Sequence, residues 1–284
     1  MADSTDPSLA DLITADFVPE IYSKNVQMAL ERKLVIVPLV DHSFQDELTL
    51  GTKIWIPVMD NASAGDVNPG SEIAGTDLAN ATAKSITVNE WQEAIAEISE
   101  MSAIQVNAPY LAKAAIKCAN AVAKAMDYTL AEKFKGFQSD DVYGADGQTL
   151  SDDIILHCME TLDEADVPED ERSIVIDPSS KVDLLKIDKF VRNDYVREVV
   201  IPTGRFGNIY NMGVFITNNL EYTDTGNYAA MFHKDALGFV AQKQPTSVKI
   251  PMPWKHKTVI NVHAIWGVAE LRDTSGICFY TRKL

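Results

Sequence analysis

The sequence predicts an α+β protein, in which helices and strands occupy separate stretches of the chain. Three observations carry this prediction: a long acidic segment between two strand-like runs, a long alanine-rich helix, and a series of short strand-like runs near the end. The chain has 284 residues and 46% hydrophobic content, which is ample for one large domain or two. No apolar run is long enough to span a membrane, so we expect no membrane partner.

The first part of the chain is acidic and partly helical. Residues 8–33 place apolar side chains at helical spacing on both sides of Pro19. Residues 34–40 form a short apolar run with Pro38 inside it, which predicts a strand at the edge of a sheet. The N-terminus lacks a basic-then-apolar signal pattern, so we expect synthesis in the cytoplasm.

The segment 57–85 cannot build a core of its own. It is 29 residues long, contains no aromatic, and lies between strand-like runs at 52–57 and 85–91. Segments of this length without secondary structure are uncommon in compact domains. Ordering it would cost roughly 1–2 kcal/mol per residue, with little apolar area to offset the cost. Either the segment stays mobile or another subunit supports it.

A helix is predicted over residues 108–135, where alanine is abundant and Pro109 falls in the first turn. Its length would be about 42 Å at 1.5 Å per residue, and Gly136 is a plausible stop. Apolar side chains follow one face of this helix. The opposite, polar face carries Lys113, Lys117, Asn120, Lys124 and Asp127.

The rest of the chain predicts a smaller α/β region and then a β-rich end. A helix at 152–165, a buried strand at 173–176 and a helix opening at Asp177-Pro178 and running to 187 come first. Six strand-like runs follow, at 214–217, 228–232, 237–242, 248–251, 259–266 and 276–280. Aromatic residues in or beside strands usually pack in the core. We therefore expect buried side chains at Trp91, Trp254, Trp266, Phe279 and Tyr280.

The sequence offers no catalytic or metal-binding pattern. Glycine-rich phosphate loops, the G-x-S-x-G elbow and the H-E-x-x-H motif are all missing. Cys118, Cys158 and Cys278 are far apart and odd in number, which argues against a disulfide framework. No two histidines are spaced as helical metal ligands. We expect no enzyme activity, no metal and no cofactor.

The net charge of −16 is unevenly distributed. Residues 1–100 hold 17 acids and 5 bases, whereas residues 101–284 hold 24 acids and 20 bases. An acidic chain is a poor direct binder of nucleic acid, because phosphate contacts need clustered lysine and arginine. The charge serves solubility, or the acidic front docks on a more basic surface of a neighbouring copy.

The order of parts resembles the major capsid proteins of tailed bacteriophages, the family with the Hong Kong 97 coat-protein fold. FVPEIYSKNVQMALERKLV leads into GTKIWIPV, SITVNEWQEAIAEIS closes the hairpin, and AVAKAMDYTLAEKF lies on the long helix. GNIYNMGVFITNNL, YAAMFHKDALGFVAQ and GVAELRDTSGICFYT follow. The resemblance covers nearly the whole chain, although no single motif in it is diagnostic.

The resemblance implies a division into four parts. Residues 1–45 would form an N-terminal arm, 46–98 an extended loop, 99–150 with 230–284 a peripheral domain, and 151–229 an axial domain. It also implies self-assembly into pentamers and hexamers of an icosahedral head shell that encloses double-stranded DNA in the virion. Separate scaffolding, portal and decoration proteins are the further partners that it suggests.

In the family the extended loop lies over an adjacent subunit, which suggests an acidic–basic pairing between copies. The acidic residues would be Asp60, Asp66, Glu72 and Asp77. Their basic partners would be Lys113, Lys117 and Lys124, or else Lys189, Arg192 and Arg197. Some members crosslink through lysine and asparagine, but nothing marks Lys53 or Lys84, which flank the loop, for that chemistry.

Two alternatives remain open. An encapsulin-like compartment would use the same fold to enclose a cargo enzyme instead of DNA. A soluble α/β enzyme would use 57–85 as a mobile lid, but it would need a convergent polar pocket beneath that segment.

Overall fold

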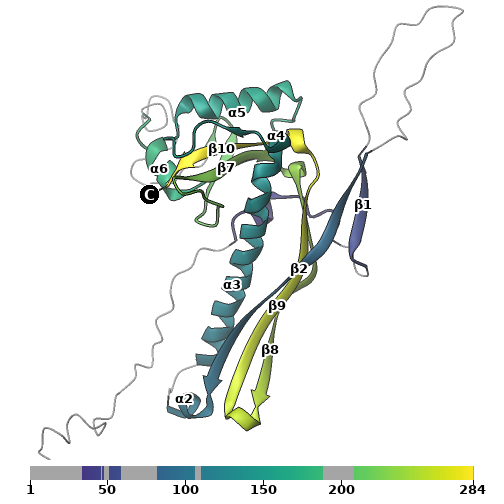
Figure 1. The fold of residues 1–284 in the computed structure, drawn as a ribbon, viewed down its shortest axis with the longest axis vertical. Coiled ribbons are helices and arrows are strands. Elements are labelled where there is room, and N and C mark those ends of the chain that lie inside the picture. Colours follow the sequence, from purple (N-terminus) through teal and green to yellow (C-terminus); the bar gives the residue numbers. More distant parts are fainter. Residues whose placement is uncertain are drawn as a thin grey trace, which may run out of the picture.

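The computed structural model describes residues 34–45, 47, 51–58, 82–105, 110–187 and 208–283. Helix α3 (Tyr110–Ala131) forms a column beside long strands, and a rounded part with its own sheet lies at the upper end of that column (Figure 1). Helices and strands alternate between residues 142 and 209 and occupy separate stretches elsewhere, which agrees with the α+β prediction. The predicted segments at 8–33 and 59–81 lie outside the described residues.

The long sheet has four antiparallel strands in the order β1-β2-β9-β8. They are β1 (Lys53–Val58), β2 (Thr82–Ser99), β8 (Leu237–Met252) and β9 (Lys257–Glu270). The two predicted runs at 237–242 and 248–251 are one strand, because register shifts around Lys243 carry the chain past Pro245. β8 lies at the edge of this sheet, where proline is tolerated.

The predicted long helix is confirmed as α3, continued by a 3-10 turn at η2 (Glu132–Gly136). Cys118, Val122, Met126 and Leu130 recur every four residues and face the long sheet. They pack on the fully buried Trp266 of β9 and form the main core. The apolar stripe read from the sequence is therefore the contact between the column and the sheet.

The rounded part is built on a six-stranded sheet in the order β3-β10-β7-β4-β6-β5. Its strands are β3 (Val142–Tyr143), β4 (Arg172–Ile176), β5 (Asn208–Ile209), β6 (Met212–Ile216), β7 (Gly226–His233) and β10 (Gly276–Arg282). Its helices are α4 (Phe137–Asp140), α5 (Asp152–Glu164) and α6 (Pro178–Leu184). All five residues of β4 are buried, as expected for a strand in the middle of a covered sheet.

The starts of the two predicted helices in this part are confirmed. α6 begins after Asp177, whose carboxylate accepts hydrogen bonds from the backbone N–H groups of Ser179 and Ser180. It ends at Leu184, three residues before the predicted end. Ser151 precedes α5 without a capping hydrogen bond from its side chain.

Two predictions from the sequence are wrong. Residues 34–40 are not a strand, because Val37–Leu39 form the 3-10 turn η1 and Pro38 suits the first position of such a turn. The expected burial holds for Trp266 and Phe279, but Tyr280 is only partly buried, and Trp91 and Trp254 are 74% and 77% exposed. Trp91 lies on the long sheet and Trp254 in the turn between β8 and β9, and nothing in the described chain covers either of them.

Each of the two sheets contains strands from more than one of the four expected parts of the chain. β7 and β10 hydrogen-bond within the sheet that also holds β4 and β6. β8 and β9 belong to the long sheet, although residues 230–284 were expected to form one domain with 99–150. The division into arm, extended loop, peripheral and axial domains stays a prediction.

Candidate inter-subunit surfaces

The long sheet has one covered face and one open face. Ala94, Ala96 and Ile98 of β2 pack towards α3. Successive side chains of a strand point to opposite faces, so Trp91 and Ile95 point away from the helix. Trp91 is 74% and Ile95 52% exposed.

The neighbouring strands continue this open face. Ile95 is paired with Asn261, which is paired in turn with Val248. Val248 and Ile250 are also exposed. We call the set Trp91, Ile95, Val248 and Ile250 the outer sheet face.

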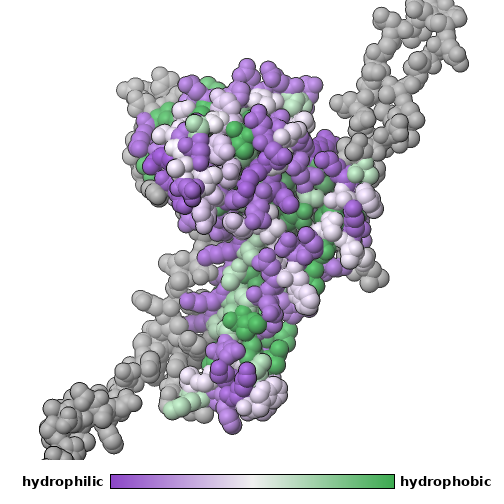
Figure 2. Space-filling view, viewed as in Figure 1, coloured by the Kyte–Doolittle hydropathy of each residue, from purple (hydrophilic) through white to green (hydrophobic). Residues whose placement is uncertain are grey.

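Three of the four tryptophans are exposed, and all three belong to the long sheet or its tip. Trp55 of β1 is 62% exposed, while Trp254 is in η4 (Pro253–Lys255), the turn between β8 and β9. Close to this tip is α2 (Glu100–Gln105), where Met101 is 69% exposed. Figure 2 shows hydrophobic side chains along this elongated lower part of the molecule. Large exposed apolar patches mark interaction sites, and tryptophan is enriched at interface centres.

Polar side chains are interleaved with these apolar ones. Asn261 Nδ2 donates to Glu93 Oε2 at 2.8 Å, and Lys257 Nζ donates to Glu97 Oε2 at 2.8 Å. The hydrogen bond and the charge of Lys257 lower the pKa of Glu97. Within the described chain, Asn261 Oδ1 and His263 Nδ1 are buried without a hydrogen-bond partner.

The structure brings the predicted lysines of α3 onto one stripe. Lys113, Lys117 and Lys124 are four and seven residues apart, a spacing that places them on the side of the helix opposite Val122. Lys117 is exposed, whereas the other two are partly buried. The stripe is a cationic surface next to the exposed side chain of Ile116.

The other predicted contact residues lie outside the described residues. They are Asp60, Asp66, Glu72, Asp77, Lys189, Arg192 and Arg197. Lys53 Nζ lies 3.8 Å from the centre of the Trp55 ring, at the base of the loop. The acidic–basic pairing between copies therefore stays a prediction.

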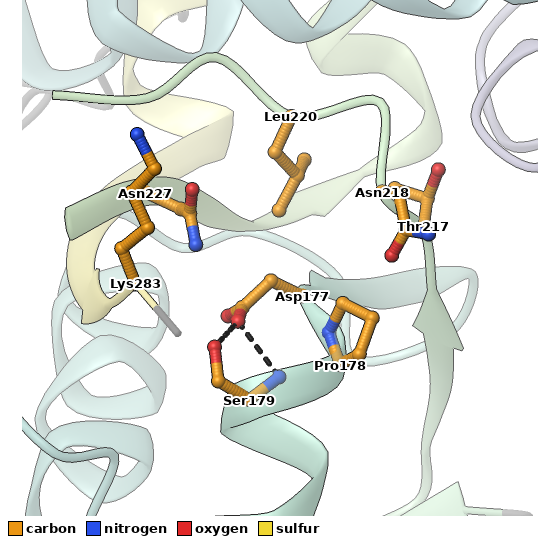
Figure 3. A pocket seen from close by; sticks show the side chains of 8 residues that line it. All are labelled: Asp177, Pro178, Ser179, Thr217, Asn218, Leu220, Asn227 and Lys283. Atoms are coloured by element: carbon orange, nitrogen blue, oxygen red, sulfur yellow. Dashed lines mark hydrogen bonds between the residues drawn. The ribbon is translucent and has the colours of Figure 1, made fainter.

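A hollow of about 170 Å³ lies where β4 and β6 end, between Asp177, Thr217 and Lys283 (Figure 3). Two of its charged side chains already have partners in the chain. Asp177 accepts from the Ser179 N–H at 2.9 Å, and the Lys283 Nζ lies 4.1 Å from the centre of the Tyr222 ring. The Ser179 hydroxyl also donates to Asp177, the N-terminal capping residue of α6, and no described residue of 57–85 lines the hollow.

The three cysteines belong to the packed cores of the chain. All three cysteines are free and buried, and burial raises the pKa of the Cys158 thiol to about 12. A thiol with so high a pKa is a poor nucleophile. Among the described residues no group of three or more His, Cys, Asp or Glu could hold a metal ion. Nor is any helix of the described chain long and apolar enough to cross a membrane.

Comparison with protein-family models and a search of curated proteins give no match. Solved structures match over nearly the whole chain. A chain of Mycobacterium phage Che8 has a TM-score of 0.77 at 20% identity, over 93% of this chain and 97% of its own. A chain from the capsid structure of the cyanophage P-SCSP1u has a TM-score of 0.71 at 15% identity, over 95% and 94%. One from the head structure of Helicobacter pylori bacteriophage KHP40 has a TM-score of 0.72 at 9% identity, over 99% of each chain.

The chain therefore has the fold of these phage head and capsid chains, and the coat-protein fold implied by the resemblance is confirmed. The exposed tryptophans are the feature that the sequence interpretation missed. A signal for one of them was present, since Glu93, Ile95 and Glu97 alternate with Ala94 and Ala96 and share a strand face with Trp91. Glutamates on the same face as Trp91 indicate a face that is open in the free subunit.

Proposed function

We propose that this chain is a major capsid protein that self-assembles into the icosahedral head shell of a tailed bacteriophage. The observation that carries the proposal is the match of the whole fold to capsid and head structures, over more than nine-tenths of both chains. Within the part of the chain that the structure describes, no group of three or more His, Cys, Asp or Glu could hold a metal ion. Its place of action would be the virion, after assembly in the host cytoplasm.

The long sheet supplies the surfaces that such a shell needs. Burying an exposed tryptophan between copies removes a large apolar area from water. The outer sheet face and the tip with Trp254 and Met101 both expose large apolar side chains. They would be covered by neighbouring copies in pentamers and hexamers.

Charge would set the register of these contacts. In this proposal residues 46–98 form the extended loop, and its acidic residues meet the lysine stripe of α3 on a neighbour. Exposed ion pairs contribute only about 0–1 kcal/mol each, so they would select the partner orientation more than they hold the shell. Residues 1–45 would be the arm, 99–150 with 230–284 the peripheral domain, and 151–229 the axial domain.

The acidic composition fits a shell into which DNA is driven, instead of a shell that binds DNA directly. With a net charge of −16, the chain would not attract DNA phosphates by itself. Double-stranded DNA would be driven in by a separate motor through a portal, and scaffolding or decoration proteins would be further partners.

Sedimentation of the purified protein tests the proposal, together with the nucleic acid content of its particles. We expect megadalton particles that hold DNA when they are taken from infected cells. Particles of the same size that hold a protein cargo and no DNA would favour the encapsulin-like compartment. A protein that stays monomeric at every concentration would refute both.

A further inference from the structure

Asp127 is a buried carboxylate in the C-terminal third of α3. The periodicity of the helix assigns it to the polar face with the lysines, yet the structure shows it to be 0% exposed. Residues 34–45, which we call the strap, cover it. Asp127 Oδ2 accepts from the Val35 N–H at 2.8 Å, and Oδ1 accepts from the Ile36 and Val37 N–H groups at 3.1 Å each.

No cation is among the partners of this carboxylate in the described chain. Besides the three amides, the side chain of Asn219 hydrogen-bonds to it. Burial raises the pKa of Asp127, and the hydrogen bonds from the strap oppose that shift. A buried charge that is satisfied mainly by backbone N–H groups of one segment constrains the position and direction of that segment.

The strap is held at a second point by β8. The Asp41 N–H donates to the Leu237 carbonyl and the Phe239 N–H donates to the Asp41 carbonyl, both at 3.0 Å. Between the two attachments, Ile36 and Val40 are fully buried in the main core. The strap therefore crosses from α3 to the long sheet.

We propose that Asp127 is the positioning residue of the strap: its three hydrogen bonds to residues 35–37 fix the path of the strap from α3 to the long sheet. The contact lies within one subunit, so it does not depend on the proposed function. In a shell it would give every arm the same starting point for contact with a neighbour. The 3-10 turn at η1 follows from the same contact, because the amides turn towards the carboxylate instead of towards a neighbouring strand.

Hydrogen–deuterium exchange of the full-length protein tests this role. Asp127→Asn keeps the shape of the side chain but has a single acceptor oxygen, so either the Val35 N–H or the Ile36 and Val37 N–H groups face an NH2 group that cannot accept from them. A hydrogen bond to a charged group contributes enough that its loss speeds exchange by about tenfold to a hundredfold. We expect that acceleration in peptides covering 34–45 and none in peptides from β4 or α5.

Leu162→Ala is the matched control, because Leu162 is fully buried in the core of the rounded part. It should lower the melting temperature without speeding exchange in the strap. Val35→Pro is the second variant. It removes the Val35 N–H, which makes the shortest of the three hydrogen bonds to Asp127, and it leaves the sequence of α3 unchanged. It should therefore reproduce the effect of Asp127→Asn.

Unchanged exchange over 34–45 in Asp127→Asn would overturn the proposal. So would an acceleration that is equal in all parts of the chain, because Asp127 would then be a general stability residue. If Asp127→Asn fails to fold, Val35→Pro decides by the same criteria.

Discussion

Replacing Trp91 with alanine should separate assembly from folding. The side chain is 74% exposed, so its truncation should cost the free subunit only on the order of 0.5 kcal/mol. Covering it with a neighbour would remove on the order of 150 Å² of apolar area from water. At about 25 cal/mol per Å² this area is worth about 4 kcal/mol for each contact, and ordering the side chain reduces the net value to about 2–3 kcal/mol.

A loss of about 2 kcal/mol per contact raises the subunit concentration needed for assembly by about 30-fold. Sedimentation velocity over a concentration series measures this shift, and thermal melting measures the stability of the subunit. Trp91→Phe keeps most of the apolar area and should assemble nearly as the natural chain does. The reasoning is refuted if Trp91→Ala forms particles at the same concentration as the natural chain, or if its melting temperature falls steeply.

Three further predictions address the lysine stripe, the core and the pH dependence. Reversing Lys113, Lys117 and Lys124 to glutamate should impair assembly while leaving the subunit folded, and a normal particle yield would sink the pairing hypothesis. Phe134→Ala should destabilise the subunit by about 3–5 kcal/mol. Phe134 is fully buried, and the centre of its ring lies 6.0 and 5.4 Å from the ring centres of two other phenylalanines. Denaturant unfolding measures this loss, and a value below 1 kcal/mol would contradict the prediction. Burial and the charges of Asp273 and Asp140 raise the pKa of Glu270, so ionising Glu270 costs stability as the pH rises above its ordinary value of 4.5. Glu270→Gln should therefore raise the melting temperature at pH 7 and lose this advantage below pH 4.5, and an equal gain at both pH values would exclude the charge as its cause.

The long helix could be predicted because its signals are local. Alanine-rich sequence, a stripe from Cys118 to Leu130 and a glycine stop all act within one helix. The strand at 173–176 and the start of α6 at Asp177-Pro178 were predictable for the same reason. Each carries its own pattern of burial or capping.

The strap could not be predicted, because its partner lies 90 or more residues away in the sequence. The amides of 35–37 satisfy Asp127 on α3, and no pattern within 34–40 records this contact. The exposure of Trp91 and Trp254 was missed for a related reason. Aromatic residues beside strands usually pack in the core, and the assembled sheet shows that the described chain leaves Trp91 and Trp254 uncovered, although the glutamates beside Trp91 already indicated an open face.

The candidate surfaces were predictable in part. The lysine stripe follows from helical spacing alone, and the structure places it opposite the core. The acidic partners and the second basic set lie outside the described residues, and a contact between copies is a property of two chains. A single sequence can indicate charge complementarity, but it does not give the pairing.

Cryo-electron microscopy of the assembled protein is the most direct test of the central claim that this chain builds a shell. We expect closed icosahedral particles in which Trp91 and Trp254 are buried against neighbouring copies. Monomers or small open oligomers at high concentration would contradict it, as would a closed shell in which both tryptophans still face solvent.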